Sequence, residues 1–238
     1  NRDAALAPID AFAPAIARAA AGGAELVVLP ERVSARRTAW RDELDERWQA
    51  LARLHHVSLV VGLGDFVADP AHNLAVVYRV DAPPLAYAKR HLIPGLEPFA
   101  PGGAPVTFGD VGVAICKDLD FQDTAAAHRA DAVVAAPAWD FGVDGELHRR
   151  MALLRAIEGG FALVRAARGG LAGAYDAWGQ PIAEAASADP PIAVVADLPL
   201  PARDALGLAR PFGLAMVAIA VAALLAQLWL GRRRPPPS

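Results

Sequence analysis

Hydrophobic and polar positions along this chain follow two periods that alternate from one segment to the next. Apolar residues three and four apart predict amphipathic helices, and short apolar runs bounded by Gly or Pro predict buried strands. The predicted helices are 5–21, 42–55, 124–130 and 146–158. The predicted strands are 26–29, 58–61, 74–78, 111–116, 132–136, 161–166, 172–175 and 192–197. Because the two kinds of element alternate, the pattern indicates an α/β domain of stacked layers.

Two segments carry neither period. Residues 81–107 are rich in Pro and Gly, so we expect a long loop there, and a loop of that length in a compact domain usually serves a function. Residues 199–211, rich in Pro, Arg and Gly, predict a linker. The chain before this linker, residues 1–198, is long enough to bury the core of one domain.

An apolar segment follows the linker. Residues 212–230 contain Gln227 as their one clearly polar side chain, and a helix of that length spans the ~30 Å hydrocarbon core of a membrane. We therefore predict one C-terminal transmembrane helix at 212–230, followed by a basic, Pro-rich tail at 231–238. Because positive flanks favour the cytoplasmic side, Arg232–Arg234 indicate that residues 1–198 lie on the extracytoplasmic side.

Composition and charge argue against several functional classes. The formal net charge of −3 and the lack of a basic stripe interleaved with aromatic residues argue against a nucleic-acid partner. A single cysteine excludes an intramolecular disulfide and a cysteine-based zinc cluster, and the histidines show no metal-ligand spacing. We therefore expect neither a metal nor a cofactor. The first residue is Asn1 and no signal peptide follows it, which indicates that the natural N-terminus lies upstream.

The one cysteine, Cys116, ends an apolar strand and is followed at once by Lys117 and Asp118. Lysine is scarce, because Lys89 and Lys117 are the only lysines among 23 basic residues. A buried lysine can shift its pKa and transfer a proton, whereas arginine stays protonated, so we expect this arginine-rich chain to keep lysine where its chemistry is needed. These features favour a nucleophilic Cys116. The alternative is a buried, inert cysteine of the core.

Glu31, Lys89 and Cys116 share one setting, because each lies at or just beyond the end of an apolar run. Strand ends of a layered sheet converge on one rim, so these residues can meet although they are far apart in sequence. Together they form a complete chemical set: a thiol attacks a carbonyl or nitrile carbon, a carboxylate transfers protons, and an ammonium stabilises the oxyanion. Each residue alone also fits a structural role, Glu31 in a turn and Lys89 on the surface.

Three motifs occur in a characteristic order: ELVVLPE at 25–31, YAKRHLIP at 87–94 and CKDLDF at 116–121. In that order they resemble the nitrilase, or carbon–nitrogen hydrolase, superfamily, and RAIEGG at 155–160 and AYDAWG at 174–179 look like later segments of it. The resemblance covers residues 1–198 and implies a four-layer α-β-β-α sandwich with a triad at Glu31, Lys89 and Cys116. It also implies that the superfamily's first strand is missing from this chain.

Two features resemble one branch of this superfamily, the apolipoprotein N-acyltransferases. Glu97 follows Lys89 at the offset of an additional essential glutamate in that branch, and an apolar segment follows the domain. The resemblance implies that an acyl chain moves from a membrane phospholipid to Cys116 and then to the N-terminal cysteine of a lipoprotein. It places the enzyme in the inner membrane, with its catalytic domain on the extracytoplasmic side and Glu97 supporting the triad.

Other residues depart from the acyltransferase pattern. Lys117-Asp118 stands where that branch usually has Tyr-Glu, and Cys-x-Asp-x-x-Phe is closer to the soluble amidases. A membrane-tethered amidase of a small amide, in which water resolves the thioester, is therefore the alternative, and an inactive binding domain is a second. Lys117 either favours the thiolate of Cys116 or points into solvent. We expect Asp118 to support the triad, and Trp139 and Phe141 to line the pocket or, more commonly for such residues, to pack.

Overall fold

The structure is a computed structural model that describes residues 1–201 and 215–225. The chain divides into two units, Asn1–Pro201 and Ala202–Ser238. In the first unit the helices are α1 (Arg2–Ala21), α2 (Arg41–His55), α3 (Gln122–Ala127) and α4 (Gly145–Gly159), with 3₁₀ turns η1 (Cys116–Asp120) and η2 (Gly142–Asp144). The strands are β1 (Leu26–Val28), β2 (Ser34–Arg36), β3 (Ser58–Asp65), β4 (His72–Arg79), β5 (Ala82–Ala88), β6 (Val106–Phe108), β7 (Val111–Val113), β8 (Val133–Trp139), β9 (Ala162–Arg168), β10 (Leu171–Tyr175) and β11 (Pro181–Ala186). The predicted α/β class is confirmed.

The strands form two sheets, each with parallel and antiparallel pairs. In the first sheet the strand order is β1-β3-β4-β5, and β2 also pairs with β3. In the second sheet the order is β11-β10-β9-β8-β7-β6, in which β7, β8 and β9 are parallel. Because β7 and β8 are parallel neighbours, Cys116, which follows β7, and Trp139, which ends β8, lie at the same edge of this sheet.

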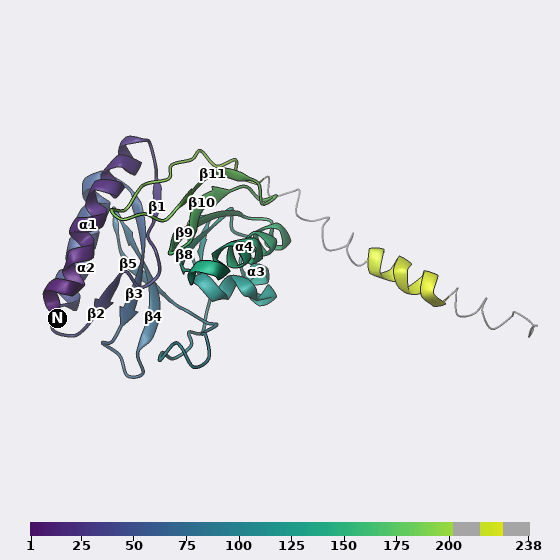
Figure 1. Ribbon diagram of the computed structural model, residues 1–238, viewed down its shortest axis with the longest axis horizontal. Helices are drawn as coiled ribbons and strands as arrows, with labels where there is room; N and C mark the ends of the chain where they lie inside the picture. The colour runs from purple at the N-terminus through teal and green to yellow at the C-terminus, as the bar shows by residue number, and fades with distance from the viewer. Residues whose placement is uncertain (202–214, 226–238) are drawn as a thin grey trace, which may run out of the picture. The chain divides into compact units, whose positions relative to one another are not determined.

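The two sheets pack face to face, and a pair of helices covers the outer face of each (Figure 1). Helices α1 and α2 cover the first sheet through a cluster that includes Ile16, Leu44 and Trp48. Helices α3 and α4 cover the second sheet through a cluster that includes Ala152 and Phe161. A further cluster, from β3, β4, β7 and β8 among others, fills the space between the sheets. The layers are therefore α-β-β-α, as predicted.

Alternate side chains of β3 pack on opposite faces of the first sheet. Leu59, Val61 and Leu63 belong to the cluster on the helix side, whereas Val60 belongs to the cluster between the sheets. Successive side chains of a strand point to opposite faces, so a strand that is buried on both faces needs a continuous apolar run. This requirement explains why the sequence reads as an unbroken apolar segment at this strand.

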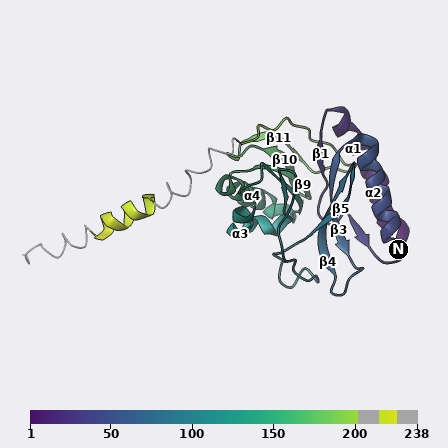
Figure 2. The ribbon, with the colours of Figure 1, turned by 180° about the vertical axis from the view of Figure 1, so that it is seen from behind.

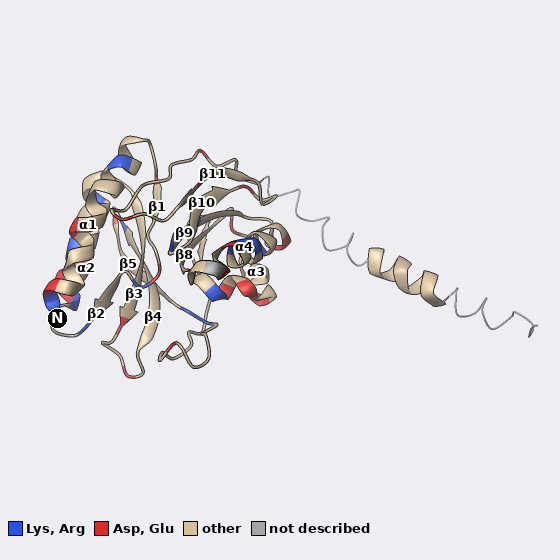
Figure 3. Ribbon diagram, in the orientation of Figure 1, with Lys and Arg blue, Asp and Glu red and all other residues tan. Residues whose placement is uncertain are grey.

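Charged residues of both signs are interspersed along α1 and α2 (Figure 3). Ion pairs join the two helices, Arg2 with Glu43 and Arg47 with Asp10, at exposed positions where such pairs add little stability. Among the described residues, α1 is the one helix that is long and apolar enough to cross a membrane. Its buried side chains pack on the first sheet, so we assign it to the outer layer of the domain.

The long loop predicted at residues 81–107 is confined to residues 89–105, because Ala82–Ala88 forms β5 and Val106–Phe108 forms β6. The prolines that suggested a loop, Pro83 and Pro84, lie in β5, which pairs with β4 and ends the strand order of its sheet. Proline has no N–H to donate, and edge strands and bulges tolerate this loss. The strand β5 lies at an edge, and its pairing with β4 is irregular between Val77 and Arg79, opposite the two prolines.

The strand predicted at 192–197 is also absent from the structure. Residues 187–201 follow β11 as an irregular segment that returns toward α1 (Figures 1 and 2). There Arg18 donates to the carbonyl of Pro191, and Ala193 packs on the cluster beneath α1 and α2. This contact is partial, because Ile192 and Val195 stay exposed, so the segment packs on the domain at a few positions instead of extending a sheet.

In the described part of the second unit, residues 215–225 form an apolar helix with exposed side chains. This helix lies within the predicted transmembrane segment at 212–230 but is shorter than the ~20 residues that a span requires. The rest of that segment, most of the linker and the tail at 231–238 lie outside the described residues. A transmembrane helix at 212–230 therefore stays a prediction.

Candidate active site

Glu31 lies in a break in the edge of the first sheet. Strands β1 and β2 pair with successive parts of β3, and residues 29–33 bulge between them. A Cβ on Gly62 of β3 would lie 2.4 Å from the carbonyl oxygen of Pro30, so only glycine lets the bulge pack this closely. The backbone N–H of Glu31 donates to the carbonyl of Ala138 in β8, 3.2 Å away, which fixes Glu31 against the second sheet.

Lys89 follows β5 and is buried between two carboxylates. Its Nζ lies 2.8 Å from Oε1 of Glu31 and 2.9 Å from Oε2 of Glu97. Asn73 of β4 donates from Nδ2 to both carboxylates, at 2.6 and 2.8 Å, and the N–H of Ile93 donates to Glu97 at 2.8 Å. The structure therefore brings the predicted Glu31, Lys89 and Glu97 into one buried network.

The environment of Lys89 keeps its side chain charged. Burial by itself lowers the pKa of Lys89, but the negative charge of Glu31, a hydrogen bond to Glu31 and the negative charge of Glu97 raise it more. The pKa of Lys89 therefore lies above its ordinary value, and its ammonium stays protonated at neutral pH. A fixed positive charge in a buried site is suited to an oxyanion.

Cys116 lies on a sharp turn between β7 and η1. Its φ is +48°, in the left-handed region that residues with a Cβ rarely adopt. Its Sγ lies 3.6 Å from the carbonyl oxygen of Trp139 at the end of β8. Arg32, next to Glu31, also has a positive φ of 53°. Backbone strain therefore occurs beside both candidate reacting groups, as is common at active sites.

The thiol of Cys116 is held in its protonated form. Burial, and then the negative charge of Glu31, raise the pKa of this thiol well above its ordinary value, although Lys89 acts in the opposite direction. The ammonium of Lys117 pairs with Asp120 at 2.9 Å instead of pointing into solvent, and Lys117 is not among the largest influences on the pKa of the thiol. A carboxylate placed like that of Glu31 can accept a thiol proton as the sulfur attacks.

Asp118 is fully buried and receives hydrogen bonds from both sides of the site. Four of its donors, at 2.8 to 3.1 Å, are the hydroxyl of Tyr87 and the backbone N–H groups of Arg90, His91 and Ile115. Ile115 precedes Cys116, and the other three donors flank Lys89 in sequence. The carboxylate of Asp118 therefore connects the turn that carries Cys116 with the segment that carries Lys89. This placement fits the predicted supporting role.

Sequence analysis missed Asn73 and Tyr87. Asn73 directly precedes the apolar run 74–78 of β4 and is buried with it, and a buried polar group needs hydrogen-bond partners. Tyr87 carried no signal in the sequence, since an aromatic residue in a strand is usually part of a core. The contacts that give both residues a place in the site come from elements distant in sequence.

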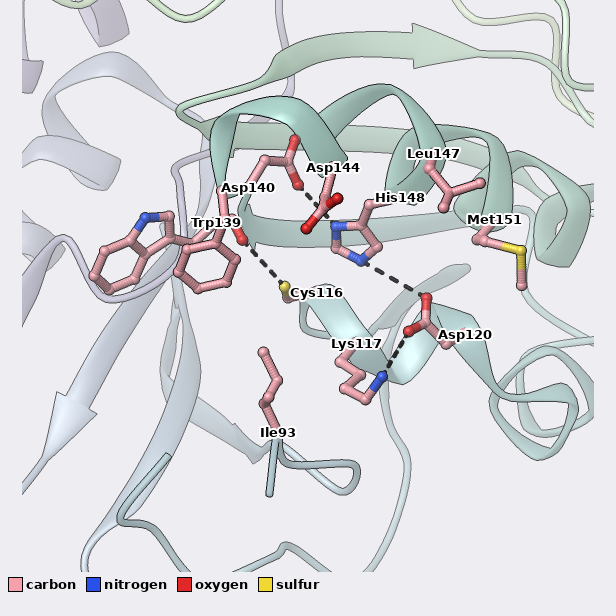
Figure 4. A pocket seen from close by; sticks show the side chains of 11 residues that line it. Ile93, Cys116, Lys117, Asp120, Trp139, Asp140, Asp144, Leu147, His148 and Met151 are labelled. Carbon is pink, nitrogen blue, oxygen red and sulfur yellow. Dashed lines mark hydrogen bonds and ion pairs between the residues drawn. The ribbon is translucent and has the colours of Figure 1, made fainter. Parts of the chain in front are cut away.

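Cys116 opens onto two cavities. The smaller, of about 130 Å³, is lined by Glu31, Arg32, Lys89, Ile93, Leu96, Glu97, Cys116, Trp139 and Phe141. The larger, of about 230 Å³, is lined by Ile93, Cys116, Lys117, Asp120, Trp139, Asp140, Phe141, Asp144, Leu147, His148 and Met151 (Figure 4). Trp139 and Phe141 thus line both cavities beside the sulfur.

In residues 1–201 and 215–225, no group of three or more His, Cys, Asp or Glu side chains is arranged to hold a metal ion.

Glu31→Gln is expected to lower the pKa of the Cys116 thiol, because it removes a negative charge that raises this pKa. The rate of iodoacetamide alkylation at a fixed pH, followed by intact mass, reports the thiolate fraction. The variant should be alkylated faster than the wild type. Lys89→Met should be alkylated more slowly, since Lys89 lowers the pKa of the thiol. An unchanged rate in Glu31→Gln would show that the carboxylate does not act on the thiol.

A sequence profile of one protein family, described as carbon-nitrogen hydrolase, matches residues 9–206. No curated protein matches the chain. Among solved structures, the chain resembles the NitN amidase from Nesterenkonia sp. AN1, with 22% identity and a TM-score of 0.69 over 82% of this chain and 87% of that chain. A variant of the Nesterenkonia amidase, 22% identical with a TM-score of 0.67 over 76% of this chain and 80% of that one, shows covalent addition of the acetamide moiety of fluoroacetamide at its active-site cysteine.

Two further solved structures resemble the chain. A carbon-nitrogen hydrolase from Helicobacter pylori G27 is 20% identical, with a TM-score of 0.67 over 80% of this chain and 82% of that one. The C. elegans NitFhit protein is 23% identical, with a TM-score of 0.66 over 80% of this chain and 56% of that one. At these identities the likeness shows a shared fold.

Proposed function

Because the chain belongs to the carbon–nitrogen hydrolase family, we propose that it hydrolyses an amide through a thioester at Cys116. The observation that carries this proposal is the buried contact of Lys89 with Glu31 and Glu97 beside the one cysteine of the chain. The similarity to amidases, one of them with an acetamide moiety on its active-site cysteine, supports the same chemistry.

In the first half-reaction, the sulfur of Cys116 attacks the amide carbonyl carbon while the thiol proton passes to Glu31. The oxyanion that forms is stabilised by the ammonium of Lys89, whose raised pKa keeps it charged. Glu31 then returns the proton to the amide nitrogen, the C–N bond breaks, and the amine leaves. The acyl group remains on the sulfur as a thioester.

In the second half-reaction, a water molecule gives a proton to Glu31 and attacks the thioester carbonyl. The C–S bond breaks, the proton returns to the sulfur, and the carboxylic acid leaves. Glu97 also pairs with Lys89 and is fixed in turn by the N–H of Ile93. This contact keeps the ammonium in one position through both half-reactions.

A second candidate is transfer of the acyl group to an amine, as in an apolipoprotein N-acyltransferase. The spacing of eight residues from Lys89 to Glu97 and the apolar segment at 212–230 favour it. In this case an amine resolves the thioester in place of water, a phospholipid is the acyl donor and a lipoprotein is the acceptor. This candidate requires the chain to lie in the inner membrane, with residues 1–198 on the extracytoplasmic side.

Release of ammonia from small amides tests the proposal directly. The wild-type chain is expected to release ammonia from acetamide, propanamide or butanamide, and Cys116→Ala should lose this activity by about 10⁴-fold or more. Intact mass should show an acyl adduct on the wild type alone, and neutral hydroxylamine should remove it, as it removes thioesters.

Incubation with phospholipid and a diacylglyceryl-cysteine peptide separates the two candidates. Acyl transfer to the peptide, with no ammonia released from any amide, would contradict the amidase proposal and support the acyltransferase. Turnover that survives Cys116→Ala would contradict both candidates. A chain that forms no adduct and turns over no substrate would match an inactive binding domain.

A further inference from the structure

The sulfur of Cys116 is reached from two sides, and the two cavities differ in chemistry. Glu31 and Lys89 line the smaller cavity, whereas Asp120 and His148 line the larger one (Figure 4). The proposed mechanism uses none of the charged side chains of the larger cavity. A cluster of polar groups beside a nucleophile, on the side away from its proton acceptor, is suited to recognise a part of the substrate that does not react.

The position of Glu31 decides which part of an amide each cavity holds. In the proposed reaction Glu31 gives a proton to the leaving amine and takes one from the incoming water, so both groups pass through the smaller cavity. The acyl group is bonded to the same carbonyl carbon and therefore extends into the larger cavity. This assignment rests on the proposed function.

His148 of α4 is held in one orientation at the wall of the larger cavity. Its Nδ1 lies 2.7 Å from Oδ1 of Asp140, a fully buried carboxylate that also accepts from Arg165 of β9. Nη2 of Arg165 lies 3.1 Å from the same Nδ1 and also donates to Asp140. Because a carboxylate only accepts, an Nδ1 lone pair 2.7 Å from Asp140 would be repelled, so we assign the ring proton of the neutral imidazole to Nδ1, which leaves Nε2 as an acceptor. None of the hydrogen bonds among the described residues uses this Nε2.

A second acceptor faces this nitrogen. Oδ1 of Asp120 lies 3.9 Å from Nε2 of His148, too far for a direct hydrogen bond, while Oδ2 of Asp120 pairs with Lys117. A single nitrogen donor between the two acceptors can reach both at about 2.8 Å. The gap therefore fits an N–H or ammonium group, whereas a carboxylate placed there would meet two acceptors.

The charges around the larger cavity favour a cation over a neutral donor. Lys117 is paired with Asp120, and Asp140 is paired with Arg165, so these charges offset one another. Asp144 adds a further negative charge to the wall. The methylenes of a short acyl chain can lie against the apolar side chains of the same wall, which are Ile93, Leu147 and Met151.

We propose that the larger cavity binds the acyl part of the substrate and selects an acyl group that ends in an ammonium, held between Asp120 and His148. The substrate class is thus a short amide of an ω-amino acid. In this assignment Asp120 and His148 contact the substrate, and Asp140 and Arg165 are positioning residues that orient the imidazole.

Matched amides that differ only in their terminal group test this specificity. β-Alaninamide and 4-aminobutanamide carry an ammonium where butanamide and pentanamide carry a methyl group. For the wild type, kcat/KM for ammonia release should be at least about tenfold higher for the ammonium member of each pair, because a charge-assisted hydrogen bond is gained. Succinamate, which ends in a carboxylate, should be the poorest substrate.

Two variants separate recognition from general damage to the enzyme. Asp120→Asn and His148→Met are expected to bring the ratio of kcat/KM within each pair close to one, and a mere loss of folded protein does not change that ratio. His128→Gln is the matched control. It removes another buried histidine–aspartate contact, 2.6 Å long to Asp131, that lies outside both cavities, and it should keep the wild-type ratio.

The outcomes distinguish this inference from the function on which it rests. Turnover of the amides with no preference for the ammonium would overturn the inference and leave the proposed function standing. A preference that survives in both cavity variants would also overturn it. No turnover of any amide, with no acyl adduct on Cys116, would overturn the proposed function and the inference together.

Discussion

Lys89→Met is expected to abolish turnover and to destabilise the domain strongly. The variant buries Glu31 and Glu97 side by side, joined by Asn73, without the cation that lies between them. Removing one partner of a buried ion pair costs about 3–5 kcal/mol, because a charge is left uncompensated. Removing an oxyanion-stabilising group costs about 100- to 1000-fold in kcat. Urea unfolding and kcat for amide hydrolysis measure the two effects separately.

The chain offers its own control, since it has one other lysine. Lys117→Met removes a partly exposed ion pair with Asp120 and should cost no more than about 1 kcal/mol. Lys89→Arg keeps the charge and should recover part of the stability, but its planar guanidinium does not replace a compact ammonium in a site that is only 1% exposed, so turnover should stay low. Near-normal turnover in Lys89→Met would show that the triad is assigned wrongly.

Asp118→Asn is expected to give the second-largest loss. Each carboxylate oxygen of Asp118 accepts at least one backbone N–H, from Ile115 on one side and from Arg90 and His91 on the other. An amide nitrogen cannot accept, so whichever way the asparagine turns, a buried N–H group loses its partner. We expect a loss of about 3 kcal/mol in the free energy of unfolding. The turn that carries Cys116 would also shift, and kcat should fall about 100-fold.

Asp123→Asn provides the comparison for this prediction. Asp123 lies five residues along the same segment and pairs with Arg90, but its side chain is half exposed, so its removal should cost less than about 1 kcal/mol. Chemical denaturation and steady-state kinetics of the two variants give the contrast. Equal stability losses in Asp118→Asn and Asp123→Asn would mean that the buried hydrogen bonds of Asp118 do not hold the site together.

Hydrophobic periodicity predicted most elements because each buries an apolar face that is continuous in sequence. The helix predicted at 146–158 is observed at Gly145–Gly159, and the strand predicted at 58–61 is the first half of β3. The elements that were predicted wrongly are those whose structure depends on which strands pair. The segment at 192–197 is as apolar as a strand, but β10 pairs with β11, to which a short turn connects it. Pairing with a segment that is close in sequence closes a smaller loop and costs less entropy.

The candidate site was predictable where residue chemistry is rare in this chain. Cys116 is the one cysteine and Lys89 is one of two lysines, so both could be named without knowledge of any contact. Asn73, Asp140, His148 and Arg165 could not be named in this way, because common polar residues acquire a role only through the neighbours that folding brings.

The sequence by itself determined the α/β class, the strands buried on both faces and the choice of candidate reacting groups, because these depend on local pattern and on side-chain chemistry. Only the tertiary structure shows which charges act on the thiol of Cys116. Lys117 is adjacent to Cys116 in sequence but pairs with Asp120, whereas Glu31, distant in sequence, lies close enough to act on the thiol. A pKa responds to burial and to charges that are near in space, and neither quantity can be read from the order of residues along the chain.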